Sequence, residues 1–87
     1  MASDQRVSRR VGQALRRLRL ERHFAMKVVA SRAGVTRPML SRYEHGRQQP
    51  TLTTLVKILR VLDCSAEDFG KRLGPWGCQH DASEARG

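Results

Sequence analysis

Apolar residues recur at helical spacing along most of the chain and predict a protein built of short helices. The first apolar stripe repeats at i, i+3, i+4 and i+7: Val11, Ala14, Leu15 and Leu18. It predicts a helix over residues 8–22, with Ser8 as the candidate N-cap. Residues 1–6 precede this pattern and are expected to form a flexible N-terminus.

A second helix is predicted over residues 26–33, where Val29, Ala30 and Ala33 form an apolar face. Gly34 follows directly and is the expected left-handed C-cap, because glycine adopts positive φ without steric cost.

A third helix starts almost at once. Thr36 is its expected N-cap, and Pro38 lies in its first turn, where a missing N–H removes no hydrogen bond. Leu40 and Tyr43 lie three residues apart and face inward. The helix is expected to end near residues 43–44.

A polar loop at residues 45–50 leads to a fourth helix, which Thr51 is expected to cap. Its apolar positions repeat at helical spacing: Leu52, Leu55, Val56, Leu59 and Leu62.

Ser65 is expected to cap a fifth helix, in which Phe69 and Leu73 pack back on the core. The Gly-Pro pair after Leu73 stops this helix. Residues 74–87 are expected to form a C-terminal tail that is flexible or contacts a second subunit.

The charge of the chain is large and uneven. The 87 residues, enough for one domain, carry 17 Lys and Arg against 8 Asp and Glu, a net charge of +9. Residues 6–60 hold 14 of the basic residues and two acids, whereas residues 61–87 hold 3 basic and 5 acidic residues. A basic body of this kind attracts polyanions. Nucleic acid is the commonest such partner, and an anionic membrane surface or an acidic protein is a further candidate.

Other kinds of function find little support. The sequence contains no paired-carboxylate motif, glycine-rich phosphate loop or nucleophile elbow, so we expect neither an enzyme nor a cofactor. Cys64, Cys78 and His80 lack a fourth ligand, which argues against a metal site. The two cysteines form no disulfide framework, and the sequence shows no secretory or bilayer-spanning stretch, so a cytoplasmic protein is expected.

The spacing within residues 26–45 favours one arrangement of the second and third helices. Ala30 is small where two helices must approach closely, and Gly34 follows four residues later, where the turn needs positive φ. The apolar contacts that would fix the angle between the helices come from five residues: Val29, Ala33, Val35, Leu40 and Tyr43. A tight turn with a small shared core is typical of a helix-turn-helix.

Three blocks of the chain resemble the Cro/CI-type (XRE-like) helix-turn-helix family of phage repressors and bacterial regulators. They are ALRRLRLER, VVASRAGVTRPMLSRYEHGR and PTLTTLVKILRVLDCSAEDF, in the family's order and spacing, within a match that spans residues 11–69. The resemblance implies an all-α fold, a compact five-helix, lambda-repressor-like domain, over residues 7–73. It also implies a sequence-specific DNA-binding transcriptional regulator.

In this family the third helix lies in the major groove with its N-terminal residues nearest the bases. The resemblance therefore implies base-reading roles for the exposed residues of this helix: Thr36, Arg37, Pro38, Ser41 and Arg42. Arg37 and Arg42 are the preferred readers, because a guanidinium can donate to guanine O6 and N7 together. The alternative for both arginines is a solvated surface charge.

Phosphate contacts are expected on either side of this helix. The candidates are Lys27, Arg32, His45, Arg47 and Gln48, each of which could instead be an ordinary solvated side chain. The chain departs from the family at Ala25 and Met26, where Thr or Ser followed by Gln is usual, and so loses an N-cap and a backbone contact. Phe24 follows His23 where a glycine is common, so a different turn shape is expected there.

The resemblance implies two further roles. Arg19 and Glu44 occupy positions that often form a buried ion pair between the first helix and the end of the third. The fifth helix and the residues after it often form the dimer contact, which points to Phe69, Leu73 and Trp76. Trp76 could equally be a lid over the core of one subunit.

These observations predict a homodimeric regulator, such as a repressor, that places residues 36–44 in the major groove of a palindromic operator. The alternative is a protein-interaction module, such as an antitoxin or a regulator bound by an anti-repressor, with Leu20 and the tail as its contact. A third hypothesis, adhesion of the basic first helix to anionic membranes, is weaker because the apolar stripe of that helix is better explained as core.

Overall fold

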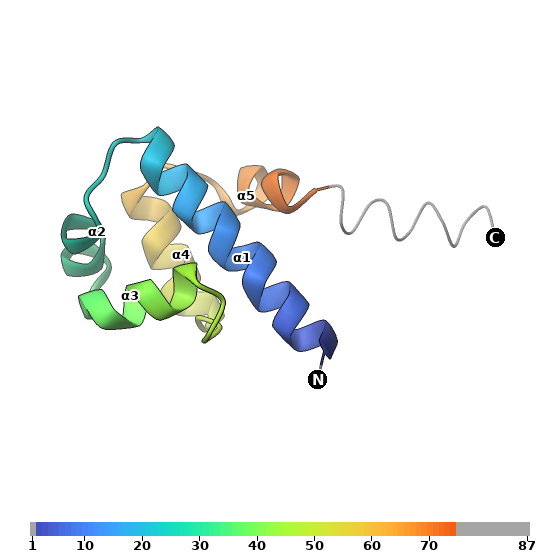
Figure 1. Ribbon diagram of the computed structural model, residues 1–87. Coiled ribbons are helices and arrows are strands. Elements are labelled where there is room, and N and C mark those ends of the chain that lie inside the picture. Colours follow the sequence, from blue (N-terminus) through green and yellow to red (C-terminus); the bar gives the residue numbers. More distant parts are fainter. Residues whose placement is uncertain (1, 75–87) are drawn as a thin grey trace.

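The described part of the chain is built from helices. Figure 1 shows the computed structural model, which describes residues 2–74. Five helices follow one another within these residues: α1 (Ala2–Glu21), α2 (Met26–Ala33), α3 (Arg37–Glu44), α4 (Leu52–Val61) and α5 (Ala66–Leu73). The all-α, five-helix fold that the sequence predicts is confirmed.

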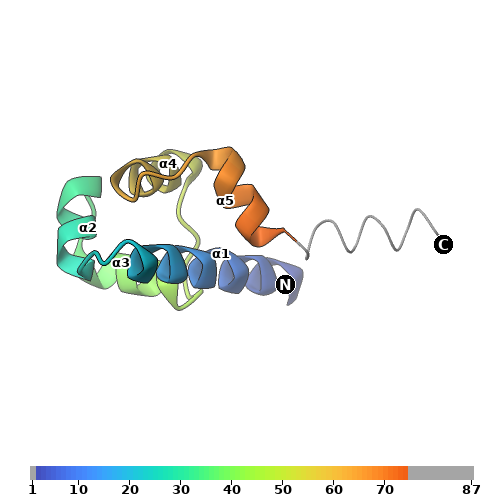
Figure 2. The same ribbon diagram turned by 90° about the horizontal axis from the view of Figure 1, so that it is seen from above.

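The helices form two layers that are closed at one end. The long helix α1 lies beside α3, and α4 and α5 form the opposite layer, as Figure 2 shows from above. α2 packs against both α3 and α4 and closes the end of the domain. Since α1 contacts α3 on one side and α5 on the other, its exposed surface has two separate faces.

One apolar core joins the layers. Its largest fully buried side chains are Leu15, Leu18, Val29, Leu40, Ile58 and Leu62. Burying a side chain of this size contributes roughly 1.5–3 kcal/mol, against a net stability of about 5–15 kcal/mol for an ordinary domain. Each of these residues therefore accounts for a substantial part of the stability of a chain this small.

Three of the four predicted N-caps are present. The side-chain oxygens of Thr36, Thr51 and Ser65 each accept a hydrogen bond from the backbone N–H three residues on, at 3.2, 3.1 and 3.0 Å. Ala25 makes no such bond at the start of α2, in line with the expected loss of that cap. Local sequence thus fixes the start of three helices through side-chain hydrogen bonds.

The first helix is longer than its apolar stripe predicts. It begins at Ala2, so the predicted start near residue 8 is wrong. Val7 lies one turn before Val11 and packs against the core, which continues the stripe towards the N-terminus. Ser8 is inside the helix rather than its N-cap, and its hydroxyl donates to the side-chain oxygen of Gln49 at 3.0 Å.

The buried face of α4 also differs from the prediction. Leu52 opens the helix beside the polar loop and is 76% exposed, whereas Ile58 was outside the predicted stripe and is fully buried. The buried positions Ile58, Leu59 and Leu62 belong to the C-terminal half of the helix and its cap. The difference arises because the choice between neighbouring apolar positions depends on where the other helices pack.

Candidate nucleic-acid interface

Gly34 sets the turn between α2 and α3. Its φ of 76° is left-handed, and its N–H donates to the carbonyl of Ser31 at 3.3 Å. The N–H of Val35 donates to the carbonyl of Ala30 at 2.9 Å. These two bonds end α2 abruptly, so the chain enters α3 at Arg37. The glycine turn that the sequence predicts is confirmed.

A second glycine, Gly12, sets the distance between α1 and α3 and was missed at the sequence level. A Cβ added to Gly12 would lie 2.3 Å from the carbonyl oxygen of Tyr43 and 2.7 Å from that of Glu44. Two backbones can approach this closely only where a side chain is absent. The C-terminal end of α3 therefore rests directly on the backbone of α1. The available signal was a glycine in the middle of a helical stripe.

Arg19 binds both α3 and the turn after α1. Its Nε and Nη2 donate to the two carboxylate oxygens of Glu44 at 2.7 and 3.0 Å, and its Nη1 donates to the carbonyl of Phe24 at 3.0 Å. Arg19 is 9% and Glu44 4% exposed, so the pair is buried. The ion pair that the family resemblance implies is present, and it fixes α3 against α1.

The turn between α1 and α2 is held by two arginines rather than by a glycine. His23 has a φ of 61°, in the left-handed region that favours glycine, and the Arg19 bond to Phe24 follows immediately. Arg22 reaches further and donates to the carbonyls of Leu62 at 3.0 Å and Asp63 at 3.3 Å, where α4 ends. The guanidinium of Arg22 thereby satisfies backbone oxygens at a helix C-terminus.

The structure brings the predicted base-reading residues together on α3 and its cap. Ser41 is half-buried. The other four are exposed: Thr36, Arg37, Pro38 and Arg42. Neither Arg37 nor Arg42 forms an ion pair within the described residues, so both guanidiniums keep their donors for a ligand. The hydroxyl oxygen of Thr36 is occupied by the cap bond from Met39, which leaves its proton as the group to donate.

His45 is tied back to α3. Its Nδ1 lies 2.8 Å from the carbonyl oxygen of Ser41, and the Ser41 hydroxyl lies 3.4 Å from the same nitrogen. Because a carbonyl only accepts, Nδ1 must carry the proton, and the neutral ring then presents Nε2 as an acceptor. An acceptor cannot bind a phosphate oxygen. In this tautomer the neutral ring of His45 has no donor left for a phosphate oxygen.

The other predicted phosphate-binding residues lie on the surface on both sides of α3. All four are exposed: Lys27, Arg32, Arg47 and Gln48. Arg32 differs from the others, because its guanidinium lies 5.8 Å from the centre of the Phe24 ring, a cation–π distance. Arg32 thus has a partner within the chain, whereas Lys27 and Arg47 have no ion pair in the part of the chain that the structure describes.

The residues predicted at the dimer contact differ in how far they are buried. Phe69 is 3% exposed and belongs to the core, so it has little surface to offer a second subunit, and its role at a dimer contact stays a prediction. Leu73 is half-buried and packs against the same core. Trp76 lies outside the described residues.

Other chemistry finds no site in the described part of the chain. No group of three or more His, Cys, Asp or Glu side chains there is arranged to hold a metal ion. No helix within residues 2–74 has the length and apolar character to span a bilayer. Cys78 and His80, weighed above as metal ligands, lie outside these residues.

Comparison with known proteins agrees with this geometry. A family model described as helix-turn-helix matches residues 15–69. The HTH-type transcriptional regulator Rv0474 of Mycobacterium tuberculosis, itself named as uncharacterised, is 37% identical over 63 residues, which are 72% of this chain and 45% of that protein. YqaE of Bacillus subtilis, named in the same way, is 32% identical over 53 residues, 61% of this chain and 46% of that protein. The chain thus spans less than half the length of these relatives.

A solved structure supports the fold. The crystal structure of the clp gene regulator ClgR from Corynebacterium glutamicum superposes with a TM-score of 0.77 and covers 90% of this chain and 83% of that one, at 23% sequence identity. The family match covers more than half of the sequence and includes the Gly34 turn and the Arg19–Glu44 pair. The chain therefore belongs to the Cro/CI-type helix-turn-helix family of DNA-binding transcriptional regulators.

Proposed function

We propose that this chain binds double-stranded DNA in a sequence-specific manner by placing α3 in the major groove. The observation that carries the proposal is the rigid seating of this short helix. Its C-terminal end rests on Gly12, and its last residue, Glu44, is held by Arg19, while Arg37 and Arg42 remain exposed. A helix fixed in this way loses little conformational entropy when it enters a groove.

The residues divide into readers and anchors. Arg37 and Arg42 would donate to guanine O6 and N7, and Ser41 would serve a base or a phosphate. Lys27, Arg47 and Gln48 would bind the sugar-phosphate backbone, which positions the domain without carrying sequence information.

Selection of bound duplexes from a random-sequence pool, at a stated salt concentration, tests the proposal. We expect enrichment of one short motif that contains guanine. Arg42→Ala should relax the preference at one position by about 1–3 kcal/mol, whereas Arg47→Ala should weaken all sequences alike. A pool that shows no enrichment, or two variants with the same effect, would contradict the assignment.

The active form that we propose is a homodimer on a palindromic operator. Two copies related by a two-fold axis would place their α3 helices in half-sites about 34–36 Å apart. The charge balance of residues 61–87, with 3 basic and 5 acidic residues, supports a contact made by this part of the chain. Sedimentation on the selected duplex should give two protomers. One protomer on a single half-site would contradict the dimer.

A second candidate function is binding of another protein, and exposed leucines favour it. Leu20 is 49% and Leu52 76% exposed, and Val56, one turn after Leu52, is half-exposed and is not among the residues packed on the core. A partner that co-purifies in stoichiometric amount at high salt and is lost with Leu52→Ser would support this function. The two functions can coexist, and both are compatible with the expected cytoplasmic location.

A further inference from the structure

The helix α1 carries two arginine pairs with the same spacing. Arg9 and Arg16 lie seven residues apart, and Arg10 and Arg17 repeat the same interval one residue later. Successive residues of a helix are rotated by about 100°. The two pairs therefore lie on different faces of one helix, although they are adjacent in sequence and identical in chemistry.

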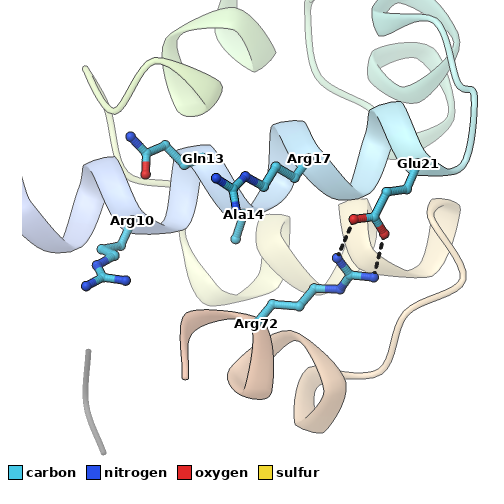
Figure 3. A pocket seen from close by; sticks show the side chains of 6 residues that line it. All are labelled: Arg10, Gln13, Ala14, Arg17, Glu21 and Arg72. Atoms are coloured by element: carbon cyan, nitrogen blue, oxygen red, sulfur yellow. Dashed lines mark hydrogen bonds and ion pairs between the residues drawn. The ribbon is translucent and has the colours of Figure 1, made fainter. Parts of the chain in front are cut away.

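The pair Arg10 and Arg17 faces α5. Both residues line a hollow between α1 and α5 that also contains the ion pair of Glu21 with Arg72. Figure 3 shows this arrangement, with the Arg72 guanidinium bound to the Glu21 carboxylate and the two α1 arginines further along the same groove. Their charges are thus directed towards the C-terminal layer of the domain and not towards α3.

The pair Arg9 and Arg16 faces the end of α3. Both line a hollow that is completed by Glu44 and His45. Arg9 also lines the next hollow with Arg47, and Arg47 lines a third together with Arg42. These three hollows adjoin at Arg9, His45 and Arg47, and together they are called the furrow, which lies between α3, the loop after it and α1. Gln13 lines both the furrow and the hollow at Arg10 and Arg17, and so marks the boundary between the two faces of α1.

Backbone contact fixes α1 against this loop. Gly46 has a φ of 71°, and a Cβ added to it would lie 2.8 Å from the Cα of Arg9. The bond from Ser8 to Gln49 at 3.0 Å joins the same two segments a few residues away. Arg9 therefore keeps a set position relative to Arg47, which the proposed function treats as a phosphate anchor.

The charges in the furrow are not compensated. Arg9, Arg16 and Arg47 are exposed, and none of them forms an ion pair within the described residues. Among the described residues that line the furrow, the acid is Glu44, and its carboxylate is bound by Arg19. Arg9 and Arg16 lie about 10 Å apart along the axis of α1, two helical turns, so each can reach a different phosphate.

We propose that Arg9 and Arg16 form a phosphate-binding ridge that extends the DNA contact of α3 along α1, and that Arg10 and Arg17 take no part in it. The ridge rests on the proposed function of α3. It adds two backbone contacts per protomer on the α3 side of α1, and it assigns roles to residues that sequence patterning leaves as part of a uniform basic surface.

Two double variants with the same change in net charge test the ridge. Arg9→Gln with Arg16→Gln removes the α3-side pair, and Arg10→Gln with Arg17→Gln removes the α5-side pair. Affinity for a mixed-sequence duplex of about 30 base pairs is measured over a range of salt concentrations. Backbone contacts do not require the operator, and each one contributes about 0.9 to the slope of log K against log salt.

We expect the slope of the Arg9/Arg16 variant to fall by about 1.8 per protomer, while the Arg10/Arg17 variant keeps most of the wild-type slope. Equally reduced slopes for the two variants would overturn the ridge, because only net charge would then matter. Wild-type slopes in both variants would overturn it too, because neither pair would then contact phosphates. Failure of the wild-type chain to bind duplex DNA at low salt would instead refute the proposed function. Thermal melting of each variant checks that the substitutions leave the fold intact.

Discussion

Two arginine–carboxylate pairs join α1 to its neighbours with similar bonds in different surroundings. Arg19 binds Glu44 of α3 at 2.7 and 3.0 Å, and Arg72 of α5 binds Glu21 at 2.8 and 3.2 Å. The side chains of the first pair are 10% and 1% exposed, and those of the second are 31% and 53% exposed. The bond lengths therefore do not distinguish the pairs, and the access of water does.

Burial changes what the loss of one partner means. A carboxylate or guanidinium left alone in the interior keeps a large desolvation penalty, whereas one left alone at the surface is solvated by water. We infer that the α1–α3 contact is the stiff side of the domain and the α1–α5 contact the more yielding one. The proposed DNA-binding surface lies on the stiff side.

Removal of the buried carboxylate should have the largest effect. Glu44→Ala leaves Arg19 buried without its partner, so the free energy of unfolding should fall by about 3–5 kcal/mol. Urea denaturation measures the loss, with Glu21→Ala as the matched change in the exposed pair. Similar losses for the two variants would remove the distinction between the two sides.

Closer packing on the α1–α3 side should also appear in the effect of glycine-to-alanine substitutions on stability. A Cβ at Gly12 would strike the Tyr43 carbonyl, so Gly12→Ala should destabilise the domain by about 1–3 kcal/mol. In α5, a Cβ at Gly70 meets nothing within 4 Å, so Gly70→Ala should stabilise it by about 0.5–1 kcal/mol. Melting temperatures of the two variants should move in opposite directions, and a shared direction would contradict the close contact.

The N-caps offer a control in which the two sides should respond alike. Thr36 of α3 and Ser65 of α5 accept equivalent bonds at 3.2 and 3.0 Å. Thr36→Ala and Ser65→Ala should each lower the free energy of unfolding by about 1 kcal/mol. If Thr36→Ala proves much more harmful, then α3 itself, and not only its ion pair, is the sensitive element.

The exposed pair should give the smallest effect, and one that depends on pH. The hydrogen bond from Arg72 lowers the pKa of the Glu21 carboxyl below its ordinary value. The stabilisation is then fully present above the pKa of an unfolded glutamate, about 4.3, and is lost as pH falls through the lower folded value. The difference in melting temperature between the wild-type chain and Glu21→Gln should shrink on acidification and in high salt. A difference that grows in acid would contradict the shift.

Local patterns predicted much of the fold. The helix starts could be predicted from the cap residues Thr36, Thr51 and Ser65, because a cap bond spans only three residues. The turn at Gly34 could be predicted because it depends on the φ of that one residue. The Arg19–Glu44 pair, 25 residues apart in sequence, could be predicted only through the family resemblance. The base-reading and phosphate-binding roles remain predictions.

Features that depend on packing between distant segments could not be predicted. Gly12 matters because α3 crosses α1 at that residue. A glycine within a helical stripe signals a close approach, but it does not say which segment approaches. Leu52 and Ile58 belong to one apolar stretch, and the position of the neighbouring helices decides which is buried. The furrow at Arg9 and Arg16 is likewise created by the arrangement of α1, α3 and their loop.

The three bonds of Arg19 also bear on how mutations in this chain would behave in a genetic screen. Because one guanidinium holds both α3 and the turn at Phe24, alleles at Arg19, Glu44 or Gly12 would lower the amount of folded protein. Their phenotypes would worsen with temperature and improve with overexpression. Alleles at Arg37 or Arg42 would leave abundance unchanged, and their phenotypes would depend little on temperature. Temperature sensitivity would therefore separate the residues that hold α3 in place from the residues proposed to contact DNA.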